Sequence, residues 1–174
     1  FSLSGADADS FAISSSGALT FNNAPDYETK DSYSLIITAS DGTTSVSQTV
    51  TIAISNINEV PQISALSSNQ LPDENQLSVV TVSASDPDVS TTLTYSLSGT
   101  DSSLFAISSS GVITFSSAPD YETPGDTDGD NNYQINVVVS DGSLSVTQAI
   151  TVKVQNVADL ISGVAVDGYV AGAT

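Results

Sequence analysis

Clusters of acidic side chains at short, repeated spacings are the residues of this sequence best suited to chemistry. The segment Asp-Tyr-Glu occurs twice, with acids at Asp26 and Glu28 and at Asp120 and Glu122. Carboxylates at such spacings can together surround a calcium ion, which takes roughly six to eight oxygen ligands at about 2.3–2.6 Å. A single acid of this kind is equally typical of a solvated turn, because Asp and Asn favour turns.

The composition of the chain excludes several other kinds of chemistry. Its 174 residues include 20 Asp and Glu but only 2 Lys and Arg, a formal charge of −18 at pH 7. Nucleic acids and anionic membranes are bound through Lys and Arg, so we expect neither as a partner. No run of about 18 apolar residues is present to insert into a bilayer. The lack of His and Cys excludes a Ser-His triad, a thiol nucleophile and the usual zinc ligands. Hard cations remain as partners, and an acidic surface that serves only solubility is the alternative.

An internal repeat organises the sequence. Residues 1–29 are identical to 95–123 at 20 of 29 positions, and residues 33–59 are identical to 133–159 at 9 of 27. The offset between the copies changes from 94 to 100 because the second copy carries six additional residues after Thr123. The repeat is therefore about 100 residues long.

The repeat predicts three segments. Nothing in the first copy matches 62–94, so we expect that copy to be truncated at its N-terminal side, in a segment cut from something longer. The last 15 residues match neither copy. We assign 1–61 to the truncated copy, 62–159 to a complete copy, and 160–174 to a linker or the beginning of a different module.

Apolar and polar residues alternate along several stretches, as at Val50, Ile52 and Ile54. This period of two is typical of half-buried β-strands, and helical spacing is absent over any useful length. Asp-Gly at 41–42 and 141–142 predicts hairpin turns. Seven strands in about 100 residues are typical of an immunoglobulin-like Greek-key sandwich. We predict an all-β chain of tandem seven-stranded sandwiches without a disulfide. The strands expected in the second copy lie near 62–66, 78–85, 93–98, 105–107, 112–116, 133–140 and 145–155.

The acids fall in loops at the ends of these strands. Asp86 and Asp88 follow strand 78–85, and Asp141 follows strand 133–140. In tandem sandwiches joined end to end, such loops face one another across the joint. Like charges about 4 Å apart repel by about 4 kcal/mol near a protein surface, so the facing acids predict a bound cation. All four glutamates belong to these motifs, namely Glu28, Glu59, Glu74 and Glu122.

The order of the motifs resembles that of cadherin repeats, in the form found in bacterial surface proteins. The resemblance covers about 1–159, and the first copy shows the same elements where it is present. The matching elements are Pro-Asp-Glu-Asn with Glu74, Asp-Pro-Asp at 86–88, Tyr-Ser-Leu-Ser-Gly at 95–99, Phe-Ala-Ile-Ser-Ser-Ser-Gly-Val-Ile-Thr-Phe at 105–115, Pro-Asp-Tyr-Glu at 119–122, Ser-Asp-Gly at 140–142, and Asn-Ile-Asn-Glu-Val-Pro at 56–61 in place of the family's Asp-rich linker.

The resemblance implies calcium ions, commonly three, at each junction between repeats. For the junction of the two copies it implies the ligands Asp26, Glu28, Asn56, Asn58 through its carbonyl, Glu59, Asp86, Asp88 and Asp141. For the lower end of the second copy it implies half a site, formed by Glu74, Asp120, Glu122, Asn156 and Asp159. This half-site departs from the family pattern, since Ala158 replaces the linker Asn and no proline follows. Asp41 is assigned to a further joint upstream.

The additional residues of the second copy are a separate signal. Asp126, Asp128 and Asp130 have the i, i+2, i+4 spacing of the first three ligands of a calcium loop. Val137 stands where an EF-hand loop has its glutamate, and no helices are expected on either side. A local calcium site and a plain Asp- and Gly-rich hairpin loop are both open interpretations.

Residues and resemblance together predict a calcium-binding module of an extracellular cell-adhesion protein, secreted or anchored through other regions. Calcium would stiffen the joint between neighbouring repeats into a rod that presents a homophilic surface, or one for another cell-surface protein or glycan. The acid pairs have the composition of a glycosidase site, but they recur in both copies beside a junction, so we expect no enzyme. The alternatives are a spacer or carbohydrate-binding appendage of a secreted enzyme, and a merely salt-adapted sandwich.

Overall fold

The computed structural model describes residues 1–89 and 91–158, so Asp159 and the segment 160–174 lie outside the described residues. The chain divides into two compact units. Among the described residues, the first contains 1–64, 84–89, 91–94 and 139–146, and the second contains 65–83, 95–138 and 147–158. No helix among the described residues has the length and apolar character that crossing a membrane requires.

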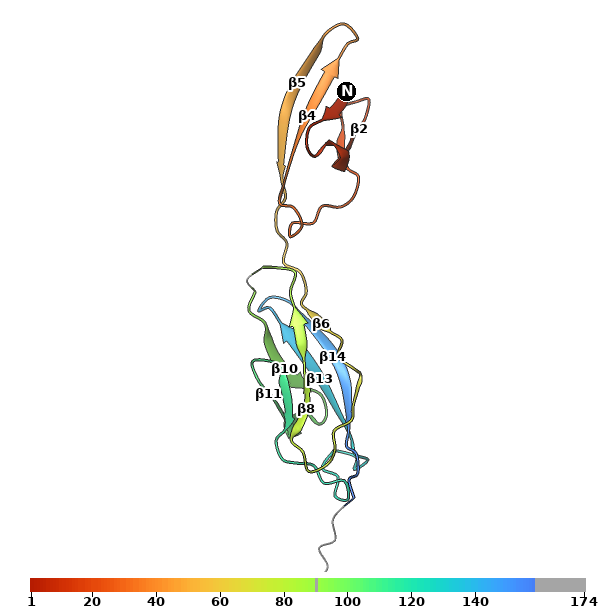
Figure 1. Cartoon of the computed structure of the whole chain (residues 1–174), viewed down its shortest axis with the longest axis vertical. Helices are drawn as coiled ribbons and strands as arrows, with labels where there is room; N and C mark the ends of the chain where they lie inside the picture. Colours follow the sequence, from red (N-terminus) through yellow and green to blue (C-terminus); the bar gives the residue numbers. More distant parts are fainter. Residues whose placement is uncertain (90, 159–174) are drawn as a thin grey trace, which may run out of the picture. The chain divides into compact units, whose positions relative to one another are not determined.

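The first copy of the repeat forms a three-stranded antiparallel sheet with the order β1-β4-β5. The hairpin between β4 and β5 turns at Asp41 and Gly42, as the sequence predicts (Figure 1). Gly42 has a φ of +91°, in the left-handed region that favours glycine. The strands are β1 (Ser2–Ser4), β2 (Phe11–Ile13), β3 (Leu19–Phe21), β4 (Ser32–Ser40) and β5 (Ser45–Ala53), with a 3₁₀ turn η1 (Ala8–Ser10).

The second copy contains three hydrogen-bonded groups of strands, with the orders β10-β13-β14-β7, β11-β12-β8 and β6-β9. These confirm the all-β prediction, with a strand at each of the seven expected places. The expected second strand is divided into β8 and β9, and the expected first strand, 62–66, is observed as β6 followed by a separate strand, β7, beyond residue 66. The elements are β6 (Gln62–Ser64), β7 (Asn69–Gln70), β8 (Ser78–Thr81), β9 (Ser83–Ser85), β10 (Thr94–Ser98), η2 (Ser102–Leu104), β11 (Phe105–Ile107), β12 (Val112–Phe115), β13 (Asn132–Ser140) and β14 (Ser145–Lys153).

The first strand is interrupted at Ala65. Ala65, directly after β6, has a φ of +45°, which breaks the extended backbone. Before this point β6 pairs with β9, and after it β7 pairs in parallel with β14. The same segment of chain thus joins two different sheets, which a continuous strand could not do.

Alternating residues of the second copy form its core. Along β13, Tyr133, Ile135, Val137 and Val139 are at most 2% exposed, and the residues between them are exposed or half-buried. On β14, Ile150 and Val152 follow the same pattern. The period of two in the sequence therefore marks the buried face of each strand. The remaining buried apolar residues include Val82, Phe105, Ile113, Phe115 and Val154.

The first copy buries much less of the same pattern. Phe11 and Leu35 are its buried apolar residues in the described chain, whereas Ile37, Val50 and Ile52 are half-buried. In the second copy, β8 pairs with β12 and covers its free edge. In the first copy, the strand equivalent to β12 is β3, which pairs with β2 alone among the described residues.

Candidate metal sites

Three loops of the first unit bring carboxylates together. Glu28 lies in the loop after β3, Glu59 in the linker after β5, and Asp88 in the loop after β9. One carboxylate oxygen from each lies within 4.8 Å of the others, and all three side chains are half-buried. The structure therefore brings together three of the acids that the sequence assigns to one junction.

Hydrogen bonds fix the loops that carry these acids. Asp88 Oδ2 accepts the backbone N–H of Glu59 at 2.9 Å, and its Oδ1 accepts Asn56 Nδ2 at 2.9 Å. Asp86 Oδ1 in turn accepts the backbone N–H of Asp88 at 2.9 Å. Asn58 donates Nδ2 to Asp141 Oδ2 at 2.8 Å. Asn58 Nδ2 also donates to the backbone oxygen of Glu59 at 3.1 Å, so these six residues form one connected network, in which the two asparagines act as donors to carboxylates.

Asp26 and Asp141 are held by their own turns. Asp26 Oδ1 accepts the N–H groups of Glu28 and Thr29, and its Oδ2 accepts the Thr29 hydroxyl at 3.0 Å. These bonds, that of the Thr29 hydroxyl first, lower the pKa of Asp26. The bond from Asn58, followed by N–H groups of the adjacent turn, likewise lowers the pKa of Asp141. Both carboxylates are therefore ionised at neutral pH.

Several buried oxygens in this first group have no hydrogen-bond partner among the described residues. They are Glu28 Oε1, Glu59 Oε2 and Asp86 Oδ2. Burial, and then the nearby charges of Glu28 and Asp88, raise the pKa of Glu59. Buried carboxylate oxygens without donors are costly unless a cation pairs with them. A hard cation with oxygen ligands fits this donor set, since every group present is a carboxylate, an amide or a backbone oxygen.

A second group of acids lies within the second unit. Oxygens of Glu74, Asp120 and Glu122 lie within 4.8 Å of one another, and Glu74 is only 2% exposed. Glu74 Oε2 accepts the N–H of Tyr121 at 2.9 Å, and Oε1 accepts the N–H of Val157 at 2.7 Å. Each oxygen of this buried carboxylate thus has a donor. The group contains three of the residues assigned to the lower end of the second copy.

The other residues assigned to this end are placed as follows. Asn156 donates Nδ2 to Glu122 Oε1 at 2.6 Å, so it joins the group. Asp120 Oδ1 accepts the N–H groups of Glu122 and Thr123, at 3.0 and 3.1 Å. This turn repeats the one at Asp26 in the first copy. Asp159 lies outside the described residues.

A third group of acids lies in the additional residues of the second copy. Oxygens of Asp126, Asp128 and Asp130 lie within 4.8 Å of one another, as their spacing in the sequence suggests. Burial opposes ionisation of Asp126, but hydrogen bonds, led by that from the Asp130 N–H, outweigh burial and lower its pKa. A hydrogen bond to Asp126 and the charge of Asp130 raise the pKa of Asp128.

Asp41 and Asp101 are among the acids that fall outside these groups. Asp41 accepts the N–H groups of Thr43 and Thr44, both at 2.8 Å, in a turn like that of Asp141, and it joins no acidic group among the described residues. Asp101 is only 3% exposed and had no role assigned from the sequence. The available signal was that an Asp stands at this position in both copies, as Asp7 and Asp101.

The sequence matches no protein-family model and no curated protein sequence. Its fold is similar to solved cadherin structures. A fragment of mouse cadherin-23 with repeats EC22-24 has a TM-score of 0.64 and 26% identity, covering 90% of this chain and 53% of the fragment. Extracellular cadherin domains 1–5 of protocadherin gamma B2 have a TM-score of 0.64 and 27% identity, covering 91% of this chain and 33% of that one.

The likeness extends to a human structure at lower identity. Repeats EC1-2 of human protocadherin-24 have a TM-score of 0.64 and 22% identity, covering 88% of this chain and 80% of that chain. The present chain thus spans about half of the cadherin-23 fragment and a third of the protocadherin gamma B2 fragment. Together with the all-β topology, these similarities establish a cadherin-like fold for the described residues.

Proposed function

We propose that this chain is a calcium-binding module of an extracellular adhesion protein built from tandem cadherin-like repeats. The observation that carries the proposal is the set of three buried carboxylate oxygens, on Glu28, Glu59 and Asp86, that lack a donor among the described residues. The cadherin-like fold supports the same function, because the similar structures are described as extracellular cadherin domains. The chain itself would act mechanically and not as an enzyme.

Calcium would supply positive charge and oxygen coordination at each acidic group, which would fix the loops that donate the ligands. In the first group, called the linker group from here on, Glu28, Glu59, Asp86 and Asp88 would hold the ion. Asp26 and Asp141 are already ionised and held by their turns, so they would offer their remaining oxygens without reorganisation. Asn56 and Asn58 orient the carboxylates of Asp88 and Asp141 by hydrogen bonds.

The second group would hold calcium through Asp120, Glu122 and Asn156, with Glu74 as the buried acid. The third group, Asp126, Asp128 and Asp130, would form a local site in the second copy. Neighbouring repeats of the same chain are the partners that follow from the linker group. Another cell-surface protein or a glycan is the proposed distal partner, and the location is the cell surface or the extracellular space.

Calorimetric titration of the whole chain with calcium tests this function. We expect saturable binding that Glu59→Gln weakens by at least tenfold, because the variant removes the charge of a half-buried ligand. Asp9→Asn is the matched control. It removes one exposed acidic charge outside all three groups, so binding should stay within about twofold of the original chain.

The same titration separates the alternatives. Equal weakening by Glu59→Gln and Asp9→Asn would show that calcium only screens an acidic surface, as in a salt-adapted protein. No binding at millimolar calcium would leave a spacer without metal-dependent stiffness. Small-angle scattering with and without calcium then tests the mechanical role, and identical profiles would contradict the rod.

A further inference from the structure

The buried carboxylate of Asp101 holds the middle of the additional residues 124–132. Asp101 Oδ1 accepts both the backbone N–H and the hydroxyl of Thr127, at 3.0 and 2.6 Å. Its Oδ2 accepts the N–H of Gln134 on β13 at 2.7 Å. Asp101 is 3% exposed, so this carboxylate depends on these three donors. One buried side chain thereby ties the loop to the strand that follows it.

In the first copy, a charged side chain helps to hold the equivalent aspartate. Asp7, at the position of Asp101, accepts the N–H of Ser34 at 2.7 Å and forms an ion pair with Lys30. Ser34 and Gln134 are equivalent in the repeat, so one half of the arrangement is unchanged. The other half differs, because the segment with Lys30 is replaced by the longer loop and Thr127 takes the place of the ammonium group.

Two further bonds hold the loop at its ends. The N–H of Gly125 donates to the Tyr133 hydroxyl at 3.1 Å, and Asn131 Nδ2 donates to the backbone oxygen of Tyr121 at 2.9 Å. Within the loop, Asp126 accepts the N–H groups of Asp130 and Asn131. The loop is therefore attached to the domain at three places, of which Asp101 is the central one.

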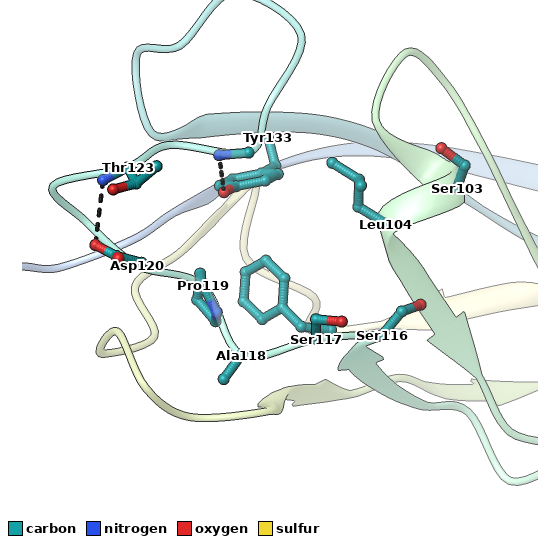
Figure 2. Close-up of a pocket in the computed structure, with 11 residues that line it drawn as sticks. Ser103, Leu104, Ser116, Ser117, Ala118, Pro119, Asp120, Thr123 and Tyr133 are labelled. Atoms are coloured by element: carbon teal, nitrogen blue, oxygen red, sulfur yellow. Dashed lines mark hydrogen bonds between the residues drawn. The ribbon is translucent and has the colours of Figure 1, made fainter.

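The loop also forms one wall of a cavity. A cavity of about 280 Å³ lies between Tyr133, Leu104, Phe115 and Pro119, and Gly125 of the loop lines it as well. Figure 2 shows Tyr133, Leu104 and Pro119 around this space, with the bond to the Tyr133 hydroxyl on one side. Phe115 and Tyr133 are only 4% and 2% exposed, whereas Thr123 and Gly125 are exposed, so the cavity has a buried floor and an open side.

Repulsion between acidic side chains of the loop opposes its attachment to the domain. The carboxylates of Asp126, Asp128 and Asp130 lie within 4.8 Å of one another, and no Lys or Arg occurs between residues 31 and 152. Like charges at this distance repel by a few kcal/mol near a protein surface. The loop is thus held in place by hydrogen bonds against the repulsion of its own acids.

We infer that residues 124–132 form a strap that the Asp101 carboxylate latches against the second copy, and that release of this latch lets the strap move away from the cavity beside Tyr133. The strap carries the third acidic group, but its latch is formed by Asp101 and Thr127, which belong to none of the proposed calcium sites. Its closed state is set by Asp101 and Thr127, and its tendency to open is set by the three acids that it carries.

Hydrogen exchange of the whole chain, measured with a chelator present, tests the latch without any metal. We expect Asp101→Asn to accelerate exchange of the 124–132 amides by about 10- to 100-fold, as loss of hydrogen bonds to a charged group predicts. Thr127→Val removes the hydroxyl and keeps the backbone donor, so it should accelerate the same amides by a smaller factor. Amides of β12 and β14 should keep their protection in both variants.

Asp7→Asn is the matched control, because it changes the equivalent acid of the first copy and should leave 124–132 unchanged. Unchanged exchange of 124–132 in both Asp101→Asn and Thr127→Val would overturn the latch. Equal acceleration throughout the second copy would also overturn it, since Asp101 would then support the whole fold and not the strap. Calcium titration is a separate measurement, so failure of the latch and failure of the proposed function are distinguishable.

Discussion

The two copies of the repeat contain the same three aromatic rings in nearly the same arrangement but in different surroundings. The ring centroids of Phe11 and Phe21 are 4.3 Å apart, and those of Phe105 and Phe115 are 4.5 Å apart. In each copy a tyrosine, Tyr33 or Tyr133, meets both rings edge-on. Yet Phe115 is 4% exposed, whereas Phe21 is half-buried. The two copies thus share the ring arrangement but differ in how deeply the second phenylalanine is buried.

The largest expected effect is a difference between the two copies in the stability lost when one of these rings is removed. Phe115→Ala should destabilise the second copy by about 3–5 kcal/mol, the range for a buried phenylalanine that leaves a cavity. Phe21→Ala should cost the first copy clearly less, because its ring is already partly exposed. Native-state hydrogen exchange of β12 and β3 amides reports each copy separately. Equal losses would show that the covering strand β8 contributes little to the second core.

A second comparison concerns the acidic groups. Glu74 has a backbone donor for each of its oxygens, whereas Glu28, Glu59 and Asp86 each have a buried oxygen without one among the described residues. Calcium removal should therefore loosen the linker amides, such as that of Glu59, by roughly tenfold or more in exchange rate. The Tyr121 and Val157 amides, which donate to Glu74, should change less.

This comparison has a clear control. Glu74→Gln replaces one acceptor oxygen by a donor, so it should loosen Tyr121 or Val157 even when calcium is present. If the two acidic groups respond equally to a chelator, hydrogen bonds to Glu74 do not preorganise the second group. The distinction between a preorganised group and a cation-dependent one would then be wrong.

Much of this arrangement could be predicted from the sequence. The alternation at Tyr133, Ile135, Val137 and Val139 predicted the buried face of a strand, because a β-strand has a period of two. The third acidic group followed from the short spacing of 126, 128 and 130, whereas the first two groups, whose acids are far apart in the sequence, were implied by the resemblance to cadherin repeats. The division of the first strand at Ala65 could not be predicted, because it depends on which distant strands pair with each half.

The role of Asp101 escaped prediction for a related reason. A lone aspartate in a polar loop has the composition of a solvated turn. Its burial results from Thr127 and Gln134, which approach it from 26 and 33 residues away. Whether each carboxylate oxygen has a hydrogen-bond donor likewise depends on the three-dimensional fold. The sequence around Glu74 and Glu59 therefore does not predict that Glu74 has donors for both oxygens and Glu59 does not. Composition identifies the acids, and tertiary contacts decide what each acid requires.

The pH dependence of the linker group gives a smaller effect. Burial and neighbouring acids raise the pKa of folded Glu59, so its protonated form is favoured in the folded chain. Without metal, its contribution to stability is fully present below the usual glutamate pKa of about 4.3 and is lost as pH rises through the folded value. NMR titration of the Glu59 carboxyl should give a midpoint above 4.3, which Asp88→Asn lowers. A midpoint at or below 4.3 would contradict repulsion within the group.

The smallest expected effect compares the counter-groups of Asp7 and Asp101. Lys30 is 41% exposed in its side chain, and its ammonium lies 4.9 Å from the centre of the Tyr33 ring. Salt weakens exposed ion pairs and leaves neutral hydrogen-bond donors largely unaffected. In 0.5 M salt (about a threefold to fourfold increase over physiological ionic strength), the Ser34 amide, which donates to Asp7, should therefore exchange slightly faster relative to other β4 amides. The Gln134 amide, which donates to Asp101 beside the uncharged Thr127, should keep its relative rate. Lys30→Met should abolish the salt response at Ser34, and a response that persists in this variant would show that the ion pair does not secure Asp7.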